Sequence, residues 1–214
     1  NTAITATGAG SNTINVYNLN TSKTGYSGIV LGDGDDTVNI LNAMSGNTVV
    51  DMGGGSFNDF TAKSITGTST TNRAAVLSRG GGTFTVKSGN KALFDFSESS
   101  DAVTLNINST LADSGIKLGS GDSYIGPDGE TGSKADISGT LINGGGGAVT
   151  INAGKLTSST INMDSTNAET TSSLDLTLTG LMKSTLVTLG SGASSINATA
   201  GITNTSIVRS HAGS

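Results

Sequence analysis

Short segments in which apolar and polar residues alternate recur along most of the chain. Each of them places apolar side chains at positions i and i+2, which lie on one face of a β-strand. Examples are Ile14–Val16, Val38–Ile40, Phe84–Val86, Val103–Ile107, Val149–Ile151 and Leu174–Leu178. Their centres recur about every 9–12 residues, with Gly-rich stretches between them, and this spacing predicts an all-β fold. The only helical candidate is Asn72–Arg79, for which we expect one short helix at most.

A Gly-rich turn follows several of these segments and forms a weak internal repeat. Its common form is Leu-Gly-x-Gly-x-(Asp/Ser)-x-apolar. This form occurs in Leu31–Val38, Leu118–Ile125 and Leu189–Ile196, and looser copies begin at Met52, Arg79 and Ile142. The gaps between successive copies are irregular, and the wider gaps could each hold two coils with one degenerate turn.

A repeat of this kind predicts a parallel β-solenoid, because each coil can bury its apolar face only by stacking on its neighbours. Gly supplies positive φ angles at the corners, and small side chains fill a thin interior. At roughly 20–25 residues per coil, the chain would form about nine coils. A β-sandwich or jelly roll with the same strand spacing is the alternative. In either case we expect one elongated β domain over residues 1–214, complete or part of a larger surface protein.

Composition excludes several other classes of protein. Gly, Ser, Thr and Asn make up 113 of the 214 residues, only 13% of residues are charged and there is no Cys. Ser, Thr, Asn and Gly disfavour helices, while the plentiful β-branched residues and a net charge of only −5 argue against disorder. No apolar run approaches the length of about 20 residues that a transmembrane helix needs. A pI near 4.6 and scattered basic residues argue against nucleic acid as a partner.

The most specific motif is Gly32–Val38, which reads Gly-Asp-Gly-Asp-Asp-Thr-Val. It resembles one unit of the RTX nonapeptide repeat, G-G-x-G-x-D-x-U-x, with Leu31 in place of the first Gly. The resemblance implies a β-roll whose turns bind Ca²⁺ through Asp carboxylates and backbone carbonyls. RTX sites are shared between tandem units, whereas the other copies here carry Ser123 and Ser194 at the position of Asp36.

Two acidic clusters are therefore candidate Ca²⁺ ligands. Ca²⁺ takes 6–8 oxygen ligands, and neighbouring carboxylates repel one another when no cation is present. The first cluster is Asp33, Asp35 and Asp36, and the second is Asp122, Asp128 and Glu130 in a loop that holds the only Pro. The alternative interpretation of each cluster is a solvated polar turn.

The composition of the whole chain also resembles that of bacterial surface-layer proteins and large secreted adhesins built on RTX-like β-rolls. This resemblance implies an extracellular or cell-surface location. It also implies a structural role.

An enzyme is not expected. His211 is the only histidine and lies in the C-terminal tail, which leaves no Ser–His–Asp triad. Asp95, Glu98 and Asp101 could meet on one face, as in a solenoid polysaccharide lyase or hydrolase, but few aromatic residues are present to line a sugar groove. We predict no catalytic residues.

The leading hypothesis is an extracellular structural protein, part of a surface layer, filament or adhesin stalk. Uncapped solenoid ends are strand edges that pair with other chains. We therefore expect self-association through Ile4–Leu19 and Ile196–Val208. The alternative is a calcium-dependent adhesin module that binds a protein or a cell-surface polysaccharide, with its site near Asp122–Glu130. Membrane insertion and nucleic-acid binding are not expected.

Overall fold

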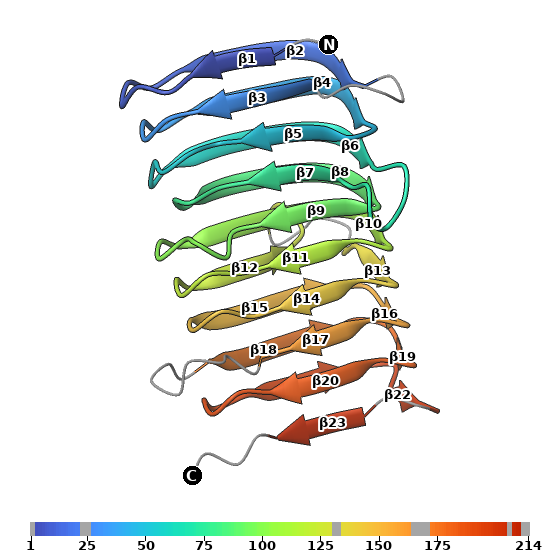
Figure 1. Ribbon diagram of the computed structural model, residues 1–214. Coiled ribbons are helices and arrows are strands. Elements are labelled where there is room, and N and C mark those ends of the chain that lie inside the picture. Colours follow the sequence, from blue (N-terminus) through green and yellow to red (C-terminus); the bar gives the residue numbers. More distant parts are fainter. Residues whose placement is uncertain (1–2, 22–26, 130–133, 164–171, 205–206, 211–214) are drawn as a thin grey trace.

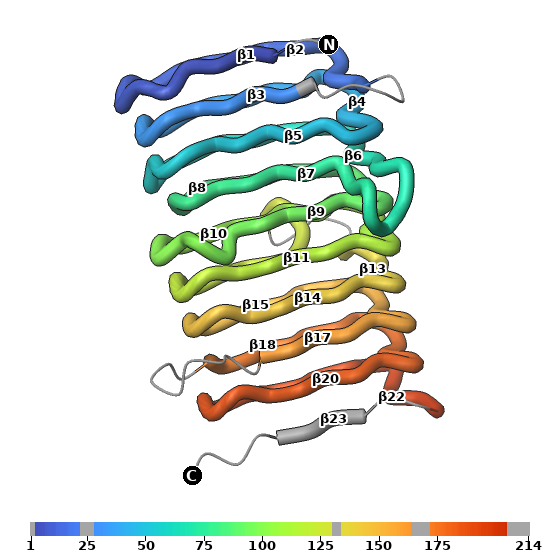
Figure 2. Tube along the Cα trace, in the orientation of Figure 1, coloured from blue at the N-terminus to red at the C-terminus, as the bar shows by residue number. Residues whose placement is uncertain are grey.

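The chain winds into a parallel β-solenoid whose coils stack along one axis (Figure 1). The computed structural model describes residues 3–21, 27–129, 134–163, 172–204 and 207–210, and these residues contain no helix. The trace advances steadily from β1 at one end of the stack to β22 near the other (Figure 2). The predicted solenoid is confirmed, and the sandwich alternative does not apply because the strands pair in parallel.

One face of the solenoid is a ten-stranded sheet, which we call sheet A. Its strands are β1 (Ala3–Ala6), β3 (Ser27–Leu31), β5 (Thr48–Asp51), β7 (Ala74–Leu77), β9 (Ala92–Asp95), β11 (Gly115–Lys117), β14 (Leu141–Asn143), β17 (Thr160–Asn162), β20 (Leu186–Leu189) and β23 (Ile207–Ser210). Successive coils differ in length, since Ala74 pairs with Ala92, 18 residues later, while Val49 pairs with Ala75, 26 residues later.

The remaining strands form a 13-stranded sheet, sheet B. Its main path is β2 (Thr13–Asn20), β4 (Thr37–Ser45), β6 (Asn58–Thr66), β8 (Gly82–Asn90), β10 (Val103–Ala112), β12 (Ser123–Gly126), β15 (Ala148–Ala153), β18 (Ser173–Leu178) and β21 (Ser195–Ala198). A branch of short strands leaves the far end of β10: β13 (Asp136–Ser138), β16 (Leu156–Thr157), β19 (Met182–Lys183) and β22 (Ile202–Thr203). The long strands of the first coils bend at register shifts, such as the one between Val16 and Asn18.

The Gly-rich turns of the sequence repeat all lie at one corner, where a strand of sheet A leads into the next strand of sheet B. We call these loops the glycine corner; they include residues 32–36, 52–57, 78–81, 118–122, 144–147 and 190–194. The loops stack so closely that several glycine positions have no room for a side chain. A β-carbon at Gly53, whose φ is +75°, would lie 2.6 Å from the carbonyl carbon of Gly32 in the preceding coil. Each copy of the Gly-rich sequence repeat therefore corresponds to one corner of a coil.

The core is a single column of apolar side chains between the sheets. Phe60, Phe84 and Leu105 lie in register on neighbouring strands and are fully buried. The ring of Phe84 also packs on that of Phe96, with ring centroids 4.5 Å apart. The prediction of a short helix at Asn72–Arg79 is wrong, because Ala74–Leu77 forms strand β7 between β5 and β9.

Candidate functional site

The acidic turn Asp33–Asp36 lies in the glycine corner between β3 and β4. Asp36 is fully buried there, whereas Asp33 and Asp35 are exposed. The Oδ1 atom of Asp36 accepts hydrogen bonds from the backbone N–H and the Nδ2 of Asn12, at 2.7 and 2.9 Å. Its Oδ2 atom is buried and has no hydrogen-bond partner within the described part of the chain. Asp36 therefore joins two coils, and one of its oxygens remains unpaired.

A buried ladder of polar side chains continues from Asp36 through the glycine corner. The backbone N–H of Asp36 donates to Oδ1 of Asn58 at 3.0 Å. The Nδ2 of Asn58 donates to the carbonyl of Gly55 at 2.7 Å and to Oγ of Ser78 at 3.2 Å. These bonds satisfy backbone groups that the tight turns leave unpaired, so the ladder stabilises the stacked corner.

The other predicted ligands do not gather around Asp36. Oδ1 of Asp35 accepts a hydrogen bond from the backbone N–H of Phe57 at 3.0 Å. Oδ1 of Asp122, in a later coil, accepts one from the N–H of Ala148 at 3.0 Å. Asp128 is exposed in the loop after β12, and Glu130 lies outside the described residues. Within the part of the chain that the structure describes, no three carboxylate or imidazole side chains are grouped to hold an ion.

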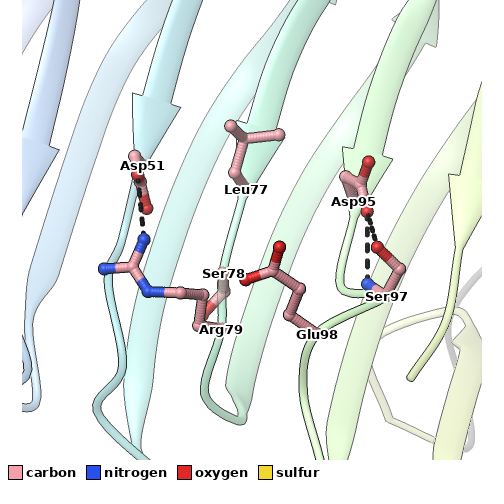
Figure 3. Close-up of a pocket in the computed structure, with 7 residues that line it drawn as sticks. All are labelled: Asp51, Leu77, Ser78, Arg79, Asp95, Ser97 and Glu98. Atoms are coloured by element: carbon pink, nitrogen blue, oxygen red, sulfur yellow. Dashed lines mark hydrogen bonds and ion pairs between the residues drawn. The ribbon is translucent and has the colours of Figure 1, made fainter.

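A pocket of about 160 Å³ opens beside the glycine corner, at the ends of β5, β7 and β9 (Figure 3). Its charged lining residues are Asp51, Arg79, Asp95 and Glu98. Asp101, the third carboxylate that the sequence grouped with Asp95 and Glu98, does not line it. The Oδ2 of Asp101 instead accepts a hydrogen bond from Oγ of Ser56 at 2.8 Å.

Both aspartates of this pocket form ion pairs between coils. Nη1 of Arg79 lies 3.4 Å from Oδ2 of Asp51, and Nζ of Lys117 lies 2.7 Å from Oδ2 of Asp95. Burial of Asp95 by itself raises its pKa, but hydrogen bonds from Lys117 and Ser97 outweigh this effect, and the pKa is lowered. A carboxyl group that stays ionised cannot donate a proton at neutral pH, so Asp95 is suited to joining coils rather than to general acid catalysis.

The two ends of the solenoid expose strand edges. Among the residues that the structure describes, β2 of sheet B pairs only with β4, and β21 pairs only with β18. Ile14 and Ile196 are partly buried in these end strands, whereas their register partners Val38 and Leu176 are fully buried. A further strand at either end would therefore bury apolar side chains and satisfy backbone hydrogen-bonding groups.

Sequence reasoning identified the glycine corner but missed the residues that pair across it. Asn12, Asn58, Arg79 and Lys117 act on residues 18 or more positions away in the chain, and only the register of the coils brings them together. Comparison of the chain with protein-family models, curated proteins and solved structures found no match. No helix in the described part of the chain is long and apolar enough to cross a membrane.

Proposed function

We propose that this protein is a structural subunit that associates end to end through the open coils of its solenoid. The observation that carries the proposal is the pair of unprotected edges of sheet B. Natural edge strands are usually blunted by Lys, Pro, bulges or a covering helix. Here the edge strands β1, β2, β21 and β22 contain neither a charged residue nor Pro, and no described helix covers them. The remaining edge strand, β23 in sheet A, contains Arg209.

The two ends are also complementary in side chains. On the outward face of sheet B, Nδ2 of Asn39 donates to Oδ1 of Asn15 at 2.9 Å, so an amide ladder reaches the edge strand β2. Asn197 occupies the matching outward position on β21 at the other end, next to Thr177. A second copy stacked head to tail would place Asn197 beside Asn15 and Ile196 beside Ile14. Such stacking continues both the ladder and the apolar core.

We further propose that the protein acts at the cell surface or in the extracellular space. A chain with few charges and many Thr, Ser and Asn residues suits a polymer more than a freely soluble monomer, for which a surface richer in charge is favourable. A surface layer, a filament and an adhesin stalk all need rods that join in this way. The parallel solenoid is compatible with the β-roll of the RTX family, whose members include secreted proteins.

Calcium binding at the acidic turn is a separate part of the proposal. Asp33 and Asp35 are exposed and would supply carboxylate oxygens, with backbone carbonyls and water as the other ligands, whereas Asp36 is buried and bonded to Asn12. A site with so few carboxylates would be weak, in the millimolar range that is typical of extracellular modules. Bound Ca²⁺ would neutralise the turn and stiffen the corner.

The end-to-end mode can be tested by blocking one end at a time. Ile14→Lys places a charge in the core column at the β2 end, and Ile196→Lys does the same at the β21 end. Each variant alone should remain a monomer in sedimentation velocity, because one of the two contact surfaces is blocked in every molecule. An equimolar mixture should form a one-to-one dimer, since each variant retains one working end that fits the other.

A matched control is Leu41→Lys, which places the same charge on an exposed position that is not at an edge. This variant should associate like the parent protein. Dimers formed by either end variant alone would contradict head-to-tail contact, and so would a mixture that stays monomeric.

A further inference from the structure

A surface groove crosses the middle coils on the outward face of sheet B, far from the strand edges at the ends. Its volume is about 660 Å³, within the range of small-molecule and cofactor sites. The floor comes from β8, β10, β12 and β15, and the wall comes from Pro127, Asp128 and Gly129, directly after β12, and from Lys134. The groove does not depend on how the ends of the solenoid associate.

Tyr124 is the aromatic residue of the groove, and Gly126 determines how its ring lies. A β-carbon at Gly126 would stand 2.7 Å from Cζ of Tyr124 and 3.1 Å from Cβ of Asn152. The ring therefore lies along its own strand, over the backbone of Gly126, in space that a side chain would otherwise fill. Its hydroxyl donates to the carbonyl of Pro127 at 3.3 Å, which fixes the ring in this position. The side chain is partly exposed and lines the groove.

Amide and hydroxyl groups flank this ring on neighbouring strands. Asn106 is the register partner of Gly126 on β10, and Asn152 follows on β15, so two amides lie on either side of the ring position. Thr104 and Thr83 continue the column of Tyr124 on β10 and β8. Asn106 is 5% exposed, and its Nδ2 donates to Oγ1 of Thr85 at 3.1 Å, so the amide is held in one orientation.

The loop contributes charges of both signs to the wall. Asp128 and Lys134 both line the groove, and no ion pair joins the two in the described structure. The loop is attached to the floor, because the backbone N–H of Asp128 donates to Oδ1 of Asn108 on β10 at 2.9 Å. The wall therefore offers an acceptor, Asp128, and a donor, Lys134.

We infer that this groove binds an oligosaccharide segment. A sugar ring has apolar C–H faces that pack on an aromatic ring, and its rim of hydroxyl groups both donates and accepts hydrogen bonds. A rigid Tyr ring between two amides, with hydroxyls beside it and a carboxylate on the wall, provides both kinds of contact. The groove crosses four strands, which at about 4.8 Å per strand gives roughly 14 Å between the outer two. An extended chain of a few sugar residues fits along this length.

A peptide fits the same groove less well. The floor strands β8, β10, β12 and β15 are interior strands of sheet B, so their backbone groups are already paired and cannot receive an added strand. The floor also offers one aromatic side chain among hydroxyls and amides, rather than apolar pockets.

The test uses a panel of soluble oligosaccharides: neutral glucans, galactans, chitin oligomers and uronic-acid oligomers. Binding is measured by saturation-transfer NMR and by calorimetry. We expect at least one class to bind, and Tyr124→Ala to weaken its affinity by about tenfold or more. Thr104→Val keeps a β-branched side chain of similar shape at this outward position and removes its hydroxyl group. It should weaken binding by about three- to tenfold without affecting the fold.

Tyr17→Ala is the matched control, because Tyr17 is also an exposed tyrosine of sheet B but lies at the β2 end, outside the groove. It should bind like the parent protein, and thermal unfolding should show that all three variants are folded. Failure of every oligosaccharide class to bind the parent protein would overturn the inference. Equal loss of affinity in Tyr124→Ala and Tyr17→Ala would overturn it too, as would binding of peptides alone.

Discussion

Replacing Phe84 by Ala tests the stacked core most sharply. Phe84 is fully buried between its register partners Phe60 and Leu105, and its ring centroid lies 4.5 Å from that of Phe96. Burial of this kind makes a Phe→Ala substitution cost about 3–5 kcal/mol. The lost ring pair with Phe96, worth about 0.5–1.5 kcal/mol, places the expected cost in the upper part of that range.

The chain contains its own control for this experiment. Phe57 lies one coil away at the glycine corner, and its side chain is 79% exposed. Phe57→Ala should change the free energy of unfolding by no more than about 0.5 kcal/mol. Its backbone N–H, which donates to Asp35, is unchanged by the substitution.

The assay is equilibrium unfolding in urea, followed by circular dichroism of the strands. Phe84→Ala should shift the transition to lower urea, while Phe57→Ala should leave it in place. Because coils contact only their neighbours, a second, earlier transition in Phe84→Ala would also agree with a solenoid whose weakest coils open first. A loss of less than about 1 kcal/mol in Phe84→Ala, or equal losses in both variants, would refute the proposed core.

Three further predictions concern the corner and its charges. Gly53→Ala should destabilise the fold by more than about 1 kcal/mol, because φ is +75° and the β-carbon meets Gly32, whereas Gly10→Ala, with open space around it, should leave the Tm almost unchanged. The pKa of Asp95 is lower in the folded protein than in the unfolded chain, so its ionised form stabilises the fold. This stability is present above the unfolded pKa and is lost as the pH falls through the folded pKa. Asp95→Asn should therefore lower the Tm at neutral pH and reduce the drop in Tm between about pH 5 and 2. Parallel curves of Tm against pH for the variant and the parent protein would contradict the pairing with Lys117. Millimolar Ca²⁺ should raise the Tm above that of a chelated sample, and less so in Asp33→Asn; equal Tm values with Ca²⁺ and with chelator would contradict a calcium site.

Local patterns were enough to predict the strands and the corner. The alternation in Phe84–Val86 follows from the pleat of one strand, and the glycines of Leu31–Val38 lie where neighbouring turns stack closely. Each segment occupies the predicted place. The corner between β9 and β10, residues 96–102, contains no Gly and is built by a local bond between Ser99 and Asp101. The wide gap between the Gly-rich turns at 80 and 119 indicated a degenerate turn but did not give its position. The helix predicted for Asn72–Arg79 was wrong because the run Ala-Ala-Val-Leu suits a buried strand as well as a helix.

The candidate sites were less predictable, because they depend on register. The sequence cannot show that Asn106 and Asn152 flank the ring of Tyr124, since coil lengths vary from 18 to 26 residues. The buried position of Asp36 was hidden for the same reason, because its partner Asn12 lies 24 residues earlier. A carboxylate in an Asp-Gly turn looks like an exposed metal ligand until the neighbouring coil is in place.

The most direct test of end-to-end association is electron microscopy of the concentrated protein, with diffraction from aligned assemblies. We predict rods that lengthen with concentration and carry a repeat of about 4.8 Å along the rod axis, because the strands run across it. Ile14→Lys should abolish the rods, and Leu41→Lys should keep them. A protein that stays monomeric at every concentration, or assemblies in which the strands lie along the long axis, would contradict the proposal.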